Sequence, residues 1–159
     1  MMPSFLSSRF AFPIDSARPK GAPHCEVWAP KLRRRITLFH PLHVRLFALL
    51  ESNTGVSNYC EGPAYLAPNH GRQLIDFWVK AGRREVFWIV VAESRPDSPR
   101  TLTPEQNINV RYIHSRHLVS HALWIENWLR ILPYLSTNAA FVNTQSLTDI
   151  AQVAVKGGP

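Results

Sequence analysis

Apolar residues recur along the chain with a helical spacing in two segments. The leucines of PLHVRLFALLES (41–52) stand three or four residues apart, which places them on one face of a helix. A proline is compatible with the first helical position, and the polar residues SNTG (52–55) supply a stop signal. The segment RHLVSHALWIENWLRILPYLS (116–136) shows the same spacing over a longer stretch. The pattern therefore predicts one helix from Pro41 and a second, longer amphipathic helix near the C-terminus.

Runs rich in β-branched and aromatic residues predict the strands. They are RRITLF (34–39), two short segments of VSNYCEGPAYLAP (56–68) separated by a turn at Gly62–Pro63, RQLIDFWV (72–79), EVFWIVVAE (85–93) and NVRYIHS (109–115). The run EVFWIVVAE is nearly continuous in apolar residues, which is typical of a strand covered on both faces. We therefore expect Val86–Val91 to lie centrally in a mixed sheet, beside the strand that carries Asp76.

The order of these elements indicates the fold class and the domain organisation. A helix, antiparallel strands, a buried strand, a further strand and a long helix predict an α/β or α+β sheet with helices on its faces. Residues 1–30 are rich in proline and show no clean periodicity, which indicates an irregular segment. The chain is thus expected to consist of an irregular, basic arm (1–35) followed by one α/β domain (36–159).

Charge is distributed unevenly between these two parts. The net charge is +7, and residues 1–45 carry eight Lys and Arg against two acidic residues, whereas the rest carries ten against nine. Such asymmetry is typical of a segment that binds a polyanion, although a solvated arm is the alternative. The candidate nucleic-acid-binding residues are the cations of KLRRR and of the turn between two predicted strands: Lys31, Arg33, Arg34, Arg35, Arg83 and Arg84.

Composition excludes several classes of protein. Hydrophobic residues at 45% and charged residues at 18% are typical of a folded globular chain, and no apolar window is long enough to span a membrane. The N-terminal segment is interrupted by charges and prolines, which argues against a secretory signal. Two cysteines make neither a disulfide framework nor a metal quartet, so we expect reduced thiols in a cytoplasmic protein without membrane contact.

A longer phrase carries a resemblance to a known family. The string HVRLFALLESNTGVSNYCEGPAYLAPNHGRQLIDFWV, then FWIVVAE, then a strand leading into ALWIENWLRILPYL, resembles the TnsA-type endonuclease subunit of heteromeric transposases. The resemblance covers residues 36–136 and rests on the order and spacing of these segments. It implies a restriction-endonuclease-like fold of the PD-(D/E)xK type, with a mixed β-sheet flanked by helices.

The resemblance also implies a site. That family carries a glutamate on the helix, an aspartate in a P-D-F phrase and an E-x-K strand. Asp76 matches the aspartate, and the helix glutamate slot falls at or beside His43. The E-x-K slot falls at residues 91–93 and places Glu93 where the lysine stands, unless a shifted alignment puts Glu93 first and Arg95 two residues later. Asp76 and Glu93 are therefore the implied catalytic and metal-ligating residues of a degenerate site.

Two functions follow from this resemblance. In an active enzyme of this kind, converging carboxylates hold Mg²⁺ or Mn²⁺, which polarises the scissile phosphate and lowers the pKa of the attacking water. With His43 at the helix slot and no lysine after Glu93, we favour an inactive subunit without a cofactor, which binds DNA or a protein partner, a transposase or a transposition regulator. The alternative is an active Mg²⁺- or Mn²⁺-dependent DNA endonuclease that cuts at transposon ends.

Histidines and tryptophans near the C-terminal helix suggest further roles. His114, His117 and His121 share one face if the helix begins early enough, and we expect a polar, phosphate- or partner-facing surface rather than a metal site. Trp124 and Trp128 stand four residues apart and are expected to be core or interface anchors.

Overall fold

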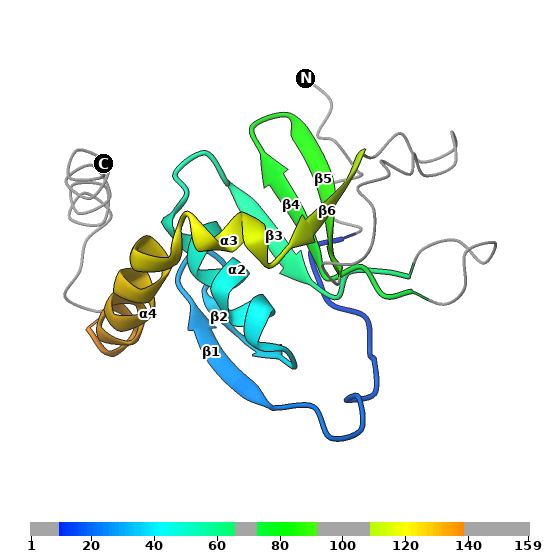
Figure 1. Ribbon diagram of the computed structural model, residues 1–159, viewed down its shortest axis with the longest axis horizontal. Coiled ribbons are helices and arrows are strands. Elements are labelled where there is room, and N and C mark those ends of the chain that lie inside the picture. The colour runs from blue at the N-terminus through cyan, green and yellow to red at the C-terminus, as the bar shows by residue number, and fades with distance from the viewer. Residues whose placement is uncertain (1–9, 66–72, 92–108, 139–159) are drawn as a thin grey trace.

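The computed structural model describes residues 10–65, 73–91 and 109–138, and it forms a mixed α/β fold with two sheets (Figure 1). The elements in chain order are β1 (Cys25–Ala29), β2 (Arg34–Leu38), α2 (Pro41–Ser52), β3 (Asn58–Glu61), β4 (Phe77–Ala81), β5 (Arg84–Val91), β6 (Asn109–His114), α3 (Arg116–Val119) and α4 (Ala122–Thr137). Strands β1 and β2 form a two-stranded sheet, and the others form a four-stranded sheet in the order β3-β4-β5-β6.

The small sheet corrects the prediction of an irregular arm. β1 pairs with β2 in antiparallel register, with Val27 opposite Ile36, and the predicted domain boundary at residue 35 falls inside β2. The arm prediction is therefore wrong for residues 25–35, while the predicted strand at RRITLF is confirmed. Phe10, also placed in the arm, is only 5% exposed and packs edge to face on Phe87 of β5. The sequence did not predict these contacts, because neither the pairing of two short strands nor the burial of a single aromatic ring produces a periodic pattern of apolar residues.

The four-stranded sheet confirms the central position predicted for β5. β4 and β5 are antiparallel, β5 and β6 are parallel, and β3 pairs antiparallel with β4 at the edge of this sheet. The turn between β4 and β5 contains Gly82 at φ 59°, a conformation that glycine adopts at little cost. Phe87 and Ile89 of β5 are fully buried on one face, whereas Trp88 and Val90 pack against the core on the other.

The helices cover one face of this sheet. α2 begins at Pro41 as predicted, and the ring nitrogen Nδ1 of His40 accepts a hydrogen bond from the amide of Leu42. α2 packs against α4 and β2, and α4 also contacts β1 (Figure 1). The core between these elements includes Phe47 of α2 and Trp128 of α4. No helix within the described ranges is both long and apolar enough to cross a membrane.

The C-terminal helix differs from its prediction because it is interrupted. Residues 116–136 form two helices, α3 and α4, separated at Ser120 and His121. The Ser120 hydroxyl and the His121 ring interact at 3.0 Å, and the dihedral angles of His121 (φ −110°, ψ 9°) are not helical. Apolar spacing alone does not reveal this break, because the apolar positions continue with helical spacing on both sides of it.

Candidate functional site

A bend at Asp76 interrupts the strand that was predicted over residues 72–79. Phe77 and Val79 point into the core under the helices, whereas Trp78 points to the opposite face. Strict alternation would place Ile75 with Phe77, yet Ile75 packs with Trp78. The alternation is therefore shifted by one residue at Asp76, as at a β-bulge, and a shift of this kind re-aims a side chain.

The bend directs the Asp76 carboxylate at the first turns of α2. Oδ1 lies 2.8 Å from Nε2 of His43, and Oδ2 accepts a 2.6 Å hydrogen bond from the amide of Val90 on β5. The amide of Asp76 donates to the carbonyl of Trp88, and its own carbonyl accepts from Gly62. The His43 ring also packs edge to face on Phe77, with the ring centroids 5.7 Å apart. Both carboxylate oxygens are thus engaged, and the aspartate joins α2 to β5.

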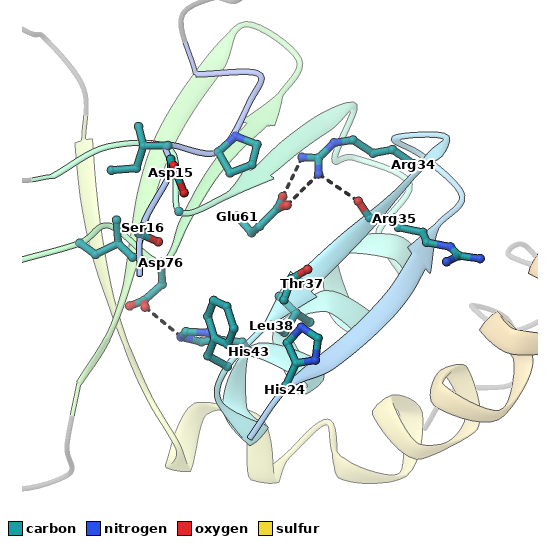
Figure 2. A pocket seen from close by; sticks show the side chains of 15 residues that line it. Asp15, Ser16, His24, Arg34, Arg35, Thr37, Leu38, His43, Glu61 and Asp76 are labelled. Atoms are coloured by element: carbon teal, nitrogen blue, oxygen red, sulfur yellow. Dashed lines mark hydrogen bonds and ion pairs between the residues drawn. The ribbon is translucent and has the colours of Figure 1, made fainter. Parts of the chain in front are cut away.

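The His43–Asp76 pair lines a pocket of about 480 Å³, which also holds an ion pair (Figure 2). Arg34 of β2 donates to both oxygens of Glu61, at the end of β3, with two distances of 2.7 Å. This bidentate geometry is the strong form of an arginine–carboxylate contact, and it fastens the small sheet to the large one. Asp15, His24 and Arg35 also line the pocket.

Glu61 is the functional candidate that sequence reasoning missed. Tyr59 and Glu61 are two residues apart in β3 and therefore face the same side of the sheet, the side that α2 covers. The sequence signal that could have identified Glu61 is its position two residues after Tyr59 in a predicted strand, which places both side chains on the same face. The neighbouring thiol of Cys60 is not a nucleophile candidate, because burial raises the pKa of Cys60 to about 12.

The residues described here do not fit a magnesium ion. Mg²⁺ requires near-octahedral oxygen ligands, and no group of three metal-binding side chains converges within residues 10–65, 73–91 and 109–138. Asp76 is bonded to His43 and Val90, and Glu61 to Arg34. Glu93, the other implied ligand, lies outside the described residues. His43 was placed at the helix carboxylate slot, and the structure brings it into contact with Asp76.

Lys31 is only partly exposed, and its side chain is anchored to the C-terminal end of α2. Its ammonium Nζ donates to the carbonyls of Leu50, Asn53 and Val56, at 2.6, 2.5 and 3.0 Å. These carbonyls belong to the C-terminal end of α2 and the turn that follows, where a cation is favoured. Burial lowers the pKa of Lys31 to about 8, and the nearby Glu51 carboxylate partly opposes that shift.

The basic run therefore offers fewer cations than its sequence suggests. Lys31 and Arg34 are committed to internal partners, whereas Arg33 and Arg35 are exposed. Arg83 and Arg84, at the tip of the β4–β5 hairpin, are exposed as well. The candidate polyanion-binding residues on the described surface are thus reduced from six to four.

Neither a protein-family model nor a curated protein sequence matches the chain.

Proposed function

We propose that this chain is a nuclease-fold subunit, similar to the TnsA-type endonuclease of heteromeric transposases, that binds DNA and a transposition partner without cleaving. The observation that carries the proposal is the contact between His43 and Asp76. The resemblance aligns these two residues with the helix and strand carboxylates of one catalytic centre, and they lie 2.8 Å apart although they come from different elements. A restriction-endonuclease-like arrangement accounts for this juxtaposition.

The order of elements is compatible with the same proposal. A helix (α2) precedes three antiparallel strands, and a further strand (β6) lies parallel to the third and leads into a helical segment. The resemblance implies the same order of a helix, the aspartate strand, the E-x-K strand and a strand–helix pair. The small sheet of β1 and β2 is an addition before this core.

The chemistry of the pocket favours binding over cleavage. A histidine at the helix slot donates to Asp76, whereas a carboxylate there would add an oxygen ligand for a cation. The Glu61 carboxylate is already paired with the Arg34 guanidinium, which occupies the place that a metal ion bound to Glu61 would take. Imidazole is a better ligand for softer metals, so any residual cation site tolerates Mn²⁺ better than Mg²⁺.

A cleavage assay tests the inactive assignment. Purified protein, alone and with a candidate transposase, is incubated with supercoiled plasmid and with transposon-end DNA in Mg²⁺ or Mn²⁺. We expect no nicking with Mg²⁺ and at most a trace with Mn²⁺. Robust nicking that disappears in Asp76→Ala would overturn the assignment and favour the active endonuclease. Nicking that survives Asp76→Ala would come from a contaminating nuclease.

DNA binding itself is expected to depend on the exposed arginines of the basic run. Replacing Arg33 and Arg35 together with alanine should weaken duplex binding at low salt and flatten the slope of log affinity against log salt by about two units, since each phosphate contact contributes about 0.9. Electrophoretic mobility shifts or fluorescence anisotropy over a salt series measure both quantities.

The matched control for this experiment is Arg130→Ala. Arg130 is an exposed arginine on α4 and does not belong to the basic run. An unchanged salt slope in the Arg33 and Arg35 double variant would show that these arginines do not contact phosphates.

A further inference from the structure

A second groove, of about 360 Å³, lies beside the C-terminal half of α2 and is separate from the pocket around Asp76. Its floor consists of aliphatic side chains from α2, β6 and α3 together with two indole rings, Trp88 of β5 and Trp124 of α4. Trp124 is fixed in place because its Nε1 donates to the Ser52 hydroxyl at 2.8 Å. An apolar floor with a few polar groups at the rim is the usual composition of a small-ligand site.

The rim of this groove is basic. Arg111 of β6, His117 of α3 and His121 line it and are exposed, and no carboxylate is found among its lining residues in the part of the chain that the structure describes. Lys31 neutralises the nearby C-terminal carbonyls of α2, which would otherwise disfavour an anion there. The groove is therefore chemically suited to a negatively charged ligand.

Two of the rim groups are held in a defined arrangement. The Arg111 guanidinium lies over the Trp88 ring, with its central carbon 5.7 Å from the ring centroid. A cation–π contact uses the positive charge of the guanidinium and not its N–H groups, which can still donate to a ligand. Nδ1 of His117 accepts a hydrogen bond from the amide of His114, so the ring carries its proton on Nε2.

We propose that this groove binds one nucleotide unit, with the phosphate at Arg111, His117 and His121 and the base on the apolar floor beside Trp124. A guanidinium with two imidazoles suits the several oxygens of a phosphate better than a single carboxylate. Indole and aliphatic surfaces accept the flat face of any base, so the site does not discriminate strongly among bases. The nucleotide is either free or part of an unpaired strand, because a base-paired nucleotide cannot place its ring on the floor.

Titration calorimetry on the full chain tests this inference with defined probes. Thymidine 5′-monophosphate is expected to bind saturably, and thymidine or inorganic phosphate alone at least tenfold more weakly. Arg111→Met should weaken nucleotide binding at least tenfold, whereas the matched control Arg130→Met should leave it unchanged. His117→Gln provides a second variant, with an expected loss of several fold, if circular dichroism shows that Arg111→Met does not fold.

A short oligothymidylate distinguishes the two sources of the nucleotide. Tighter binding of the oligonucleotide than of the monophosphate identifies an unpaired strand, and equal affinity identifies a free nucleotide; both support the site. The inference is overturned if nothing binds saturably at millimolar concentration, or if Arg111→Met and Arg130→Met behave alike. Since Arg33 and Arg35 lie outside the groove, duplex binding tests the proposed function separately.

Discussion

Replacing Lys31 with methionine is expected to lower the free energy of unfolding by about 3 to 4 kcal/mol, an effect of the size seen when a buried ionic group loses its partner. The ammonium satisfies three carbonyls at the end of α2 and in the turn that follows, and the Lys31 backbone amide donates to Glu51, which is 7% exposed. Methionine keeps the aliphatic stem but donates nothing. Denaturant unfolding measured by circular dichroism gives the change.

Glu51 accounts for part of this expected loss. Burial raises the pKa of Glu51, whereas the Tyr59 hydroxyl, 2.6 Å away, and Lys31 act in the opposite direction. Without Lys31 the buried carboxylate loses the cation that compensates it among the described residues, so adding Glu51→Gln to Lys31→Met should recover about 1 kcal/mol. Arg35→Met, at an exposed position of the same basic run, is the control and should change stability by less than about 0.5 kcal/mol. Equal losses in Lys31→Met and Arg35→Met would contradict the anchoring role.

Replacing His43 with glutamate is expected to destabilise the protein by about 2 kcal/mol without divalent cations and to make its stability depend on them. The introduced carboxylate faces Asp76 across the 2.8 Å contact that His43 now fills, and like charges at that distance disfavour ionisation of both. A divalent cation relieves the repulsion. At a concentration one hundred times its dissociation constant, a bound ion stabilises by about 2.7 kcal/mol.

Thermal unfolding with and without Mn²⁺ measures this dependence. His43→Gln is the matched control, because its amide can still donate to Asp76 but adds no charge. We expect Mn²⁺ to raise the melting temperature of His43→Glu by several degrees and to leave that of His43→Gln unchanged. A cation response in neither variant would show that the surroundings of Asp76 do not resemble a nuclease centre.

Much of the fold could be predicted because apolar periodicity records which face of an element is buried. The α2 helix and the central position of β5 follow from spacing and from an unbroken apolar run, and both are confirmed. The β1 strand was missed because its pairing with β2 depends on a partner strand and not on a local pattern. The bend at Asp76 was missed for a related reason. A one-residue shift in which face the side chains point to leaves the largely apolar sequence of residues 74–79 looking like an ordinary strand.

The site was predictable only in part. The resemblance aligned His43 and Asp76 with one centre, and their contact depends on the bend and on the position of α2. The cations of the basic run could not be assigned individually, because Lys31 and Arg34 differ from Arg33 and Arg35 in their three-dimensional partners alone. Net charge describes the chain as a whole, whereas desolvation and pairing decide which charges face solvent.

Two contacts hold the small sheet to the rest of the protein, the Lys31 anchor on α2 and the Arg34–Glu61 ion pair, and they determine where the chain can be shortened. A chain that begins at residue 36, the predicted start of the domain, would lack β1, the Lys31 anchor and the Arg34–Glu61 pair. Ile36 and Leu38 would lose their partner strand, and Glu51 and Glu61 would keep buried charges without their cations. Expression boundaries for this protein therefore belong before β1, and a protease that cuts in the β1–β2 turn should leave both fragments associated until the fold itself opens.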